Sequence, residues 1–305
     1  MIKHLVLPGG CVNGIKTLGI LKHLSDTGVI NVENIVSIDA TSIGSVIAIL
    51  IALKFSWPDI TDYVVKRPWH ETIDFSVANF VSLFTQKGFY DQKLYNLFFK
   101  PFFDAKGISL DITFLDFYNL TNIDLHFYSL SLNRFELIDL NYIDFPDLPI
   151  IKAVQMTSAI PVLIEPVFHN DEYFVDGAYG SNYPLKYCLH REGVLEDEVL
   201  GIYNEIEKKD LDNKDLDKKD LDYKEEEKEK EQETNEKSFF EYIVFFSNQL
   251  LRNTRLKVDD TRGYIQHEVV CPVSSFSVES LTKVVKCESF RQELLDDGIH
   301  IASSF

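Results

Sequence analysis

Short apolar runs alternate with longer periodic ones in the first seventy residues, as expected for strands that lead into helices. Residues 4–7 form a short apolar run, residues 35–41 read as a buried strand, and each ends at a turn. After the first turn, apolar residues recur at helical spacing from Ile15 to Leu24, and residues 45–53 form an almost wholly apolar second helix. Ser56 and Pro58 mark the start of a third helix over 56–67. This order of strands and helices predicts an α/β domain.

The middle of the chain is rich in aromatic residues and then returns to strands. Ten Phe and Tyr residues lie between Phe75 and Phe103, and they either wall an apolar pocket, form a lid or pack in the core. A helix over 91–100 is predicted to stop at Pro101. Residues 125–130 and 134–139 read as a hairpin, 151–158 as a helix, 162–168 as extended and 173–175 as a strand.

Residues 205–237 differ sharply in composition from the rest of the chain. They contain 15 acidic residues and 9 lysines but few large apolar residues, which predicts a largely disordered insertion. We therefore divide the chain into a core (1–204), this insertion (205–237) and a C-terminal part of the same domain (238–305). The C-terminal part is expected to hold a helix over 238–258, which covers the core or docks on lipid. A strand over 266–271 and helices over 280–286 and 289–296 follow.

Charge and cysteine usage narrow the class of protein. The 305 residues are 45% hydrophobic and carry a net charge of −18, which argues against nucleic-acid binding and against docking of a basic face on anionic lipid. The four cysteines form no CxxC pair and the histidines show no ligand spacing, so no structural zinc is expected. Without a signal-peptide pattern or an apolar run of membrane-spanning length, we expect an intracellular, cytoplasmic protein, peripheral on membranes at most.

The second strand ends in a turn of the form small-x-Ser-x-Gly, made by residues 40–44. This is the pattern of a nucleophile elbow, which presents a serine hydroxyl above the sheet at the start of a helix. Ala40 and Gly44 are the small residues that let strand and helix approach closely. The alternative is that Ser42 only caps the helix.

A glycine-rich turn, Pro8-Gly9-Gly10-Cys11-Val12-Asn13-Gly14, follows the first strand. Backbone N–H groups in such a turn suit an anion. Its spacing matches neither a dinucleotide fingerprint nor a P-loop, so a nucleotide site is poorly supported. Two other interpretations are open. The turn forms an oxyanion hole that serves Ser42, or it is only a tight turn between strand and helix.

A third unusual feature is an acid at the end of the apolar strand 173–175. Asp176 is followed at once by Gly177 and the small residue Ala178. Asp176 either acts as an acid–base group or caps its own backbone in an Asx-type turn.

The Gly-Gly loop, the Ser elbow, the Ala159-Ile160-Pro161 segment and the late Asp-Gly-Ala resemble those of the patatin-like phospholipases. The resemblance covers roughly residues 1–200 and is weaker over 238–305. It implies a three-layer α/β/α fold with a mostly parallel central sheet, and a Ser–Asp dyad without metal or cofactor. It also implies hydrolysis of acyl esters in phospholipids or neutral lipids at a membrane surface, and it leaves open a protein activator.

Carried over by position, the resemblance makes Ser42 the nucleophile and Asp176 the acid that activates it. The oxyanion hole would comprise Gly9, Gly10, Cys11 and Ile43. The loop departs from the usual family pattern because Cys11 stands for a glycine and Asn13 for a cation. These departures motivate a second hypothesis, a weakly active or inactive lipid-binding or effector protein. A third hypothesis is a Ser-His-Asp hydrolase with His267 or His300 as its base.

Overall fold

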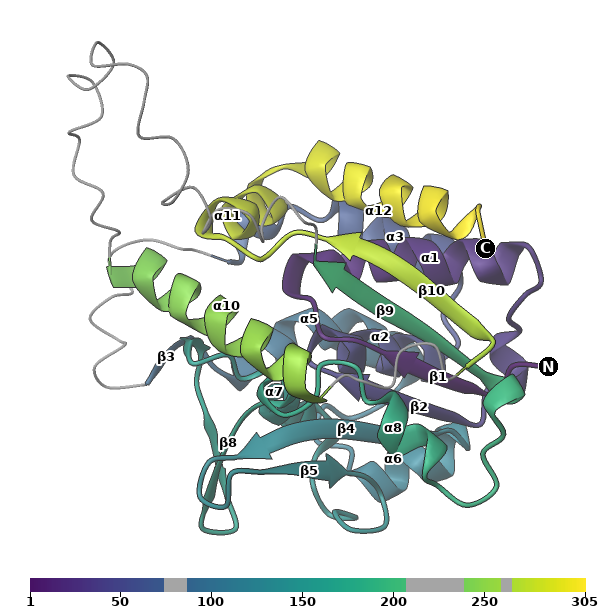
Figure 1. The fold of residues 1–305 in the computed structure, drawn as a ribbon, viewed down its shortest axis with the longest axis horizontal. Coiled ribbons are helices and arrows are strands. Elements are labelled where there is room, and N and C mark those ends of the chain that lie inside the picture. The colour runs from purple at the N-terminus through teal and green to yellow at the C-terminus, as the bar shows by residue number, and fades with distance from the viewer. Residues whose placement is uncertain (74–86, 207–238, 259–264) are drawn as a thin grey trace, which may run out of the picture.

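An eight-stranded sheet forms the centre of the molecule (Figure 1). The computed structural model describes residues 1–73, 87–206, 239–258 and 265–305. The strands are β1 (His4–Leu7), β2 (Ser37–Thr41), β3 (Gly88–Tyr90), β4 (Asp124–Ser131), β5 (Glu136–Leu140), β6 (Val162–Ile164), β7 (Val167–His169), β8 (Glu172–Asp176), β9 (Val199–Ile206) and β10 (His267–Val273). Of these, β3 and β6 form a separate two-stranded sheet.

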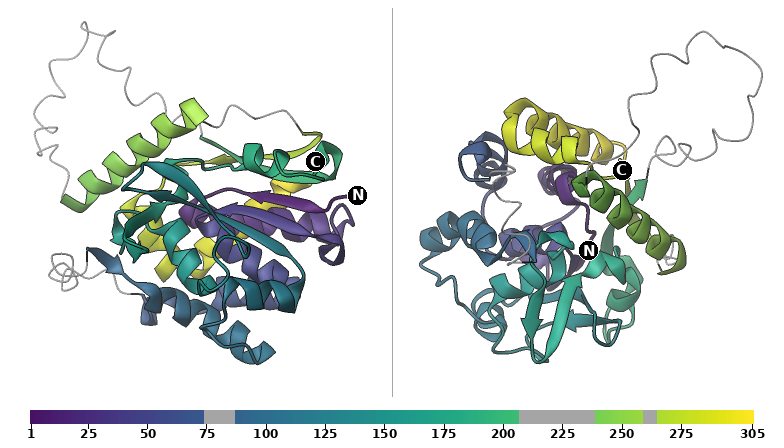
Figure 2. Two further views of the ribbon diagram at one scale, coloured as in Figure 1. Left: turned by 90° about the horizontal axis from the view of Figure 1, so that it is seen from below. Right: turned by 90° about the vertical axis from the view of Figure 1, so that its left-hand side faces the viewer.

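Helices cover both faces of the central sheet (Figure 2). They are α1 (Gly14–Asp26), α2 (Ile43–Ala52), α3 (Trp57–Lys66), α5 (Gln92–Lys106), α6 (Phe114–Thr121), α7 (Ile150–Ser158), α8 (Leu185–Leu189), α10 (Phe239–Val258), α11 (Val278–Lys286) and α12 (Glu288–Ala302). On one face, α1, α2 and α12 bury the main apolar core. On the other face, α8 covers a smaller cluster that includes Val6 and Tyr183.

The strand pairing brings two distant segments together. Strands β10, β9, β1, β2 and β4 are mutually parallel, whereas β5 and β8 run antiparallel to β4. Because β5 occupies one edge of β4 from Phe127 to Ser131, β2 and β8 share the other edge. They meet end to end there, since Thr41 pairs with Tyr128 and Asp176 pairs with Ser129. The predicted α/β/α fold with a mostly parallel sheet is confirmed.

The face of the sheet beneath α8 carries a buried polar network. Arg191 donates two hydrogen bonds to the carboxylate of Asp39, at 2.7 and 2.8 Å, and Tyr128 donates a third at 2.7 Å. His126 lies nearby between Asp139, 2.7 Å from Nδ1, and Asp124, 3.2 Å from Nε2. Burial alone would lower the pKa of His126, but the hydrogen bonds to the two aspartates outweigh it and raise the pKa to about 10.

Pro101 does not stop its helix, contrary to the sequence prediction. It lies inside α5, which continues to Lys106 and ends at Gly107 in the left-handed conformation. The carbonyl that loses its donor belongs to Leu97, which is exposed, so water can satisfy it. Phe102 and Phe103, on the next turn, are buried in the core, and this packing outweighs the cost of the proline.

Two residues that the sequence analysis assigned to the charged segment belong to a strand. Glu205 and Ile206 complete β9, and residues 207–238 lie outside the described residues. The C-terminal part adds β10 beside β9 in the central sheet, and α12 packs against α1. In the described ranges, no helix is long and apolar enough to cross a membrane.

Candidate active site

Ser42 forms the turn between β2 and α2 with a backbone that L-residues rarely adopt. Its φ is 54° and its ψ is −126°, a region that costs on the order of 1–3 kcal/mol for a residue with a side chain. Gly44 permits the turn, because a Cβ there would lie 2.7 Å from the carbonyl oxygen of Leu7. The tight turn predicted from residues 40–44 is therefore present, and α2 begins directly after Ser42.

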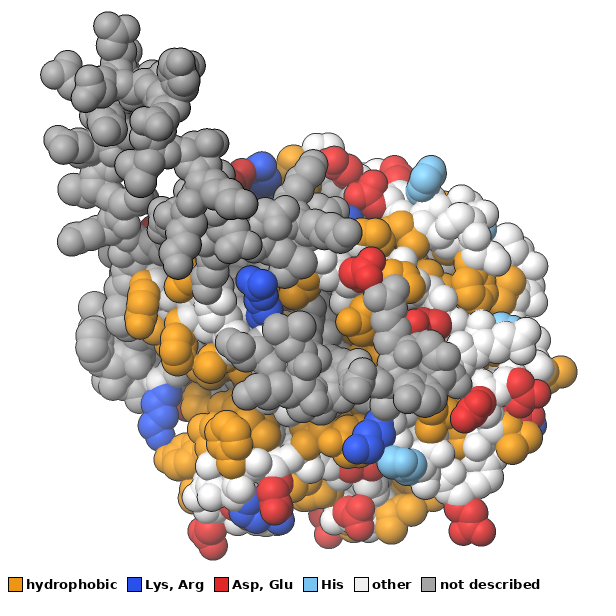
Figure 3. Space-filling model, viewed as in Figure 1, with side chains coloured by type: hydrophobic (Ala, Val, Ile, Leu, Met, Phe, Trp, Pro, Cys, Tyr) orange, Lys and Arg blue, Asp and Glu red, His pale blue; other side chains and the backbone are white. Residues whose placement is uncertain are grey.

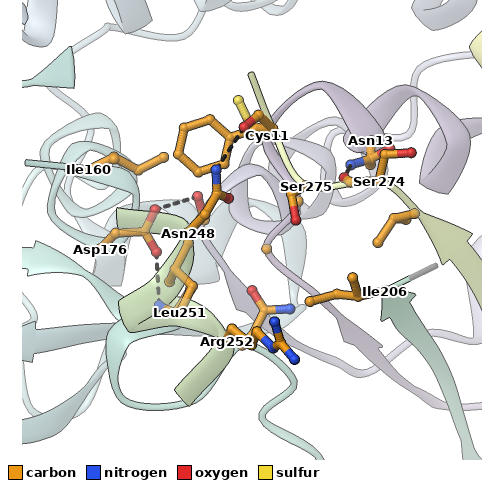
Figure 4. Close-up of a pocket in the computed structure, with 17 residues that line it drawn as sticks. Cys11, Asn13, Ile160, Asp176, Ile206, Asn248, Leu251, Arg252, Ser274 and Ser275 are labelled. Atoms are coloured by element: carbon orange, nitrogen blue, oxygen red, sulfur yellow. Dashed lines mark hydrogen bonds between the residues drawn. The ribbon is translucent and has the colours of Figure 1, made fainter. Parts of the chain in front are cut away.

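The hydroxyl of Ser42 donates a hydrogen bond to Asp176 Oδ2 at 2.7 Å, and Asp176 is labelled in Figure 4. Both side chains are buried, and they meet because β2 and β8 abut on β4. Asp176 Oδ1 accepts the N–H of Ala178 at 2.8 Å, so the Asx-type turn considered from sequence also exists. Gly177 is required there, since a Cβ would lie 1.9 Å from the carbonyl oxygen of Tyr128.

The glycine-rich turn lies directly beside Ser42. A Cβ on Gly9 would come within 3.1 Å of Ser42 Cβ. The N–H of Gly9 donates to Asn182 O at 3.2 Å and is not available as an oxyanion donor, which the sequence did not reveal. Within the described part of the chain, the N–H groups of Gly10, Cys11 and Ile43 have no hydrogen-bond acceptor. These three groups are the donors that an oxyanion at Ser42 could use.

Two buried asparagines hold this turn in place, and sequence reasoning missed one of them. Asn204, near the end of β9, donates its side-chain amide to Gly9 O at 3.0 Å. The carbonyl of Gly9 and the N–H of Gly10 belong to one planar peptide unit, so this bond also fixes the direction of the Gly10 N–H. Asn13 donates to Ser274 O at 3.3 Å. Neutral amides therefore hold the loop, with Asn13 at the position where the family usually has a cation.

Thr157 on α7 holds the strained backbone of Ser42, and the sequence did not single it out. Its Oγ1 accepts the Ser42 N–H at 3.0 Å and donates to the carbonyl of Tyr128. The three residues are buried, so these bonds are shielded from water. The detectable signal was a threonine among apolar residues at the end of a predicted helix, which by itself has no specific meaning.

Cys11 has a φ of 50°, so the glycine-like conformation required by the loop is adopted by a residue with a side chain. Burial raises the pKa of its thiol to about 12, and the negative charge of Asp176 adds to the effect. The thiol is therefore neutral at physiological pH. What Cys11 offers to the site is its backbone N–H.

Two cavities meet at Ser42. The smaller has a mixed lining, with the polar side chains of Asp176, Asn248 and Arg252 beside apolar ones such as Ile160 and Phe276, and Arg252 lies at one end (Figure 4). The larger, of about 300 Å³, is apolar and runs between α1, α2, α5 and α11. Its walls include Trp69, Leu94 and Phe98, so part of the aromatic-rich region lines a pocket. Another part, including Phe99 and Phe103, is core, and Phe75, Phe80 and Phe84 lie outside the described residues.

The histidines considered as alternative bases lie elsewhere. His267 is the first residue of β10, which runs parallel to β9. It therefore lies where the parallel strands begin, whereas Ser42 lies where β2 ends. His300 is exposed in the last turn of α12. Among the described residues, no histidine lines either cavity.

Comparison with known proteins identifies the family of the chain. A family model described as patatin-like phospholipase matches residues 5–189, which include the glycine-rich turn, Ser42 and Asp176. The chain belongs to the patatin-like phospholipase family. The resemblance noted from sequence is thereby confirmed. Asn204 and all of α10 lie beyond the residues that the patatin-like model matches.

Two viral proteins and one solved structure are similar to this patatin-like chain. An uncharacterized protein of Acanthamoeba polyphaga mimivirus is 28% identical over 187 residues, which are 60% of each chain. A probable lipid hydrolase of Invertebrate iridescent virus 6 is 24% identical over 61% of this chain and 63% of its own length. The alignments thus span less than two thirds of both relatives. VipD from Legionella pneumophila shares the fold, with a TM-score of 0.51 and 16% identity over 99% of this chain and 67% of VipD.

Proposed function

We propose that this protein is a serine-type lipid acyl hydrolase in which Ser42 is the nucleophile and Asp176 the general base. The observation that supports this most directly is the 2.7 Å hydrogen bond from Ser42 Oγ to Asp176 Oδ2, at the point where the two cavities meet. A serine hydroxyl is a weak nucleophile until a base accepts its proton. Asp176 is buried, has limited hydration and lies within proton-transfer distance.

The reaction would run through an acyl-enzyme. Ser42 Oγ attacks the ester carbonyl carbon while its proton passes to Asp176, and the carbonyl oxygen becomes an oxyanion. The N–H groups of Gly10, Cys11 and Ile43 would stabilise that charge, and one such donor typically contributes about 3 kcal/mol. Asp176 then returns the proton to the leaving alcohol as the C–O bond breaks. A water molecule, activated by the same aspartate, releases the fatty acid.

The two cavities fit the two parts of an amphipathic ester. The apolar cavity, bounded by side chains such as Ile15, Val46 and Leu163, suits an acyl chain. The smaller cavity, which holds the polar groups of Asp176 and Asn248, suits the rest of the lipid, and Arg252 at its end is placed to meet an anionic group. This division supports a lipid ester over a small soluble ester as the natural substrate.

Hydrolysis of a short-chain p-nitrophenyl ester and of mixed phospholipid vesicles tests the proposal. Turnover by the wild type should be lost in Ser42→Ala and Asp176→Asn. The matched control is Ser56→Ala, because Ser56 also donates to an aspartate, at 2.6 Å, but from an exposed helix cap. Wild-type activity that survives in Ser42→Ala would refute the assignment.

The second candidate is a lipid-binding or effector protein with little turnover. The non-glycine residue at φ 50° and the neutral Asn13 in the oxyanion loop favour it. It predicts that Ser42→Ala retains the biological effect of the wild type. Loss of that effect together with loss of hydrolysis would exclude it.

A further inference from the structure

Exposed aromatic side chains are concentrated on the side of the sheet where β2 ends and β8 begins. Tyr242 and Phe246 on α10 are 52% and 47% exposed, and Phe168 on β7 and Phe135 in the β4–β5 turn are 53% and 75% exposed. We infer that these four residues, the docking edge, seat the protein on the surface of a lipid bilayer by apolar contact. The inference rests on the proposed lipid substrate and adds the surface that reaches it.

Helix α10 connects this edge with the candidate active site. Its inner side buries Val244 and Ser247, and Asn248 on the same side donates to Phe276 O at 2.8 Å. Asn248 also lines the smaller cavity, which contains Ser42. Tyr242 and Phe246 lie one turn apart on the outer side, with stacked rings 6.4 Å apart. One helix therefore covers the cavity and presents aromatic rings outward, which Figure 3 shows as hydrophobic side chains over α10.

The sheet places the other two aromatics at the same edge. Phe135 follows β4, which runs parallel to β2, so the turn lies on the side where β2 delivers Ser42. Phe168 pairs with Tyr173 near the start of β8, which runs antiparallel to β4 and therefore starts on that same side. Segments from three parts of the chain thus expose aromatic residues around one end of the sheet.

A lipid surface is the occupant that fits this edge best. Aromatic side chains gain free energy at the boundary between hydrocarbon and headgroups, where the ring meets apolar surface. The substrate of the adjoining site would itself be held in such a surface. The net charge of −18 disfavours an electrostatic attraction to anionic lipid, so apolar contact must supply the binding. We therefore specify a zwitterionic bilayer as the probe.

The test measures binding without catalysis. The 305-residue Ser42→Ala protein is mixed with phosphatidylcholine vesicles and sedimented at 0.1 and 0.5 M NaCl. The same is done with a variant that also carries Tyr242→Ser and Phe246→Ser. The pair should weaken the partition coefficient about 25-fold, because each half-exposed ring contributes roughly 5-fold. Ile143→Ser is the matched control. Ile143 is 68% exposed but follows β5. Because β5 runs antiparallel to β4, it ends on the far side of the sheet from the docking edge.

Each result decides the inference independently of turnover. Salt-insensitive binding that falls in the double variant but not in Ile143→Ser supports it, provided that the thermal midpoints are equal. Absence of binding by the parent, equal binding by the double variant or loss of binding at 0.5 M NaCl overturns it. The inference is also overturned if sedimentation velocity shows that the double substitution converts a dimer into a monomer while vesicle binding stays the same. Failure of the hydrolase proposal would appear instead as an inactive wild type.

Discussion

Thr157→Val is the substitution that most directly tests how the fold holds its nucleophile. Valine keeps the shape of threonine but removes the oxygen that accepts the Ser42 N–H at 3.0 Å. A buried N–H without a partner costs about 1–3 kcal/mol, and loss of the hydrogen bond to the Tyr128 carbonyl adds about 1 kcal/mol. We expect the free energy of unfolding to fall by about 2–4 kcal/mol.

The effect on activity follows from the strained backbone. Without Thr157, Ser42 can relax from its φ of 54° toward a common conformation, and the relaxation moves its hydroxyl away from Asp176. A displacement of about 1 Å is expected to lower kcat on the order of 10²-fold. The substrate cavities are formed by other side chains, so KM should change much less.

The assay compares Thr157→Val with Thr157→Ser, which keeps the hydroxyl and loses one methyl group. Urea unfolding and steady-state hydrolysis are measured for both variants and the wild type. The serine variant should lie within about 1 kcal/mol of the wild type in stability and keep most of its kcat. Equal kcat and stability in the valine variant would show that Thr157 does not support the elbow.

Three further predictions concern the loop and the polar network. Asn204→Leu should lower kcat by up to about 10²-fold with little change in KM, because the direction of the Gly10 N–H is no longer fixed. Unchanged steady-state kinetics would exclude this positioning role. Iodoacetamide at pH 8 should alkylate Cys287 well before Cys11. A hydrogen bond from Ser289 lowers the thiol pKa of Cys287, whereas a pKa of about 12 keeps the Cys11 thiol neutral. Peptide mass spectrometry measures the order of alkylation, and equal rates would contradict the prediction. His126 should titrate near pH 10 in NMR spectra, not near 6.5. Since its folded pKa is raised, it stabilises the fold fully below pH 6.5, and that contribution declines as the pH rises toward 10; a transition near 6.5 would show that the aspartates do not hold its charge.

Local patterns in the sequence singled out Ser42 and Asp176, and the resemblance to the patatin-like family gave them candidate catalytic roles. Ser42 and Gly44 form a recognisable turn because only small residues let a strand and a helix pass so closely. Asp176 was visible because an acid at the end of an apolar strand, followed by glycine, is unusual. The strands and helices were largely readable from apolar periodicity. The prediction that a helix stops at Pro101 was wrong, because burial of the neighbouring phenylalanines outweighed the tendency of proline to end a helix.

The contacts among these groups were decided by the tertiary structure. That Ser42 and Asp176 lie 2.7 Å apart follows from β2 and β8 sharing one edge of β4, which is a property of strand pairing across more than a hundred residues. Thr157 and Asn204 carry no local pattern, because a side chain that supports a backbone group far away in sequence is specified only when the chain has folded around it. The sequence thus determined which residues have the chemistry, and the packing of the sheet determined which of them meet.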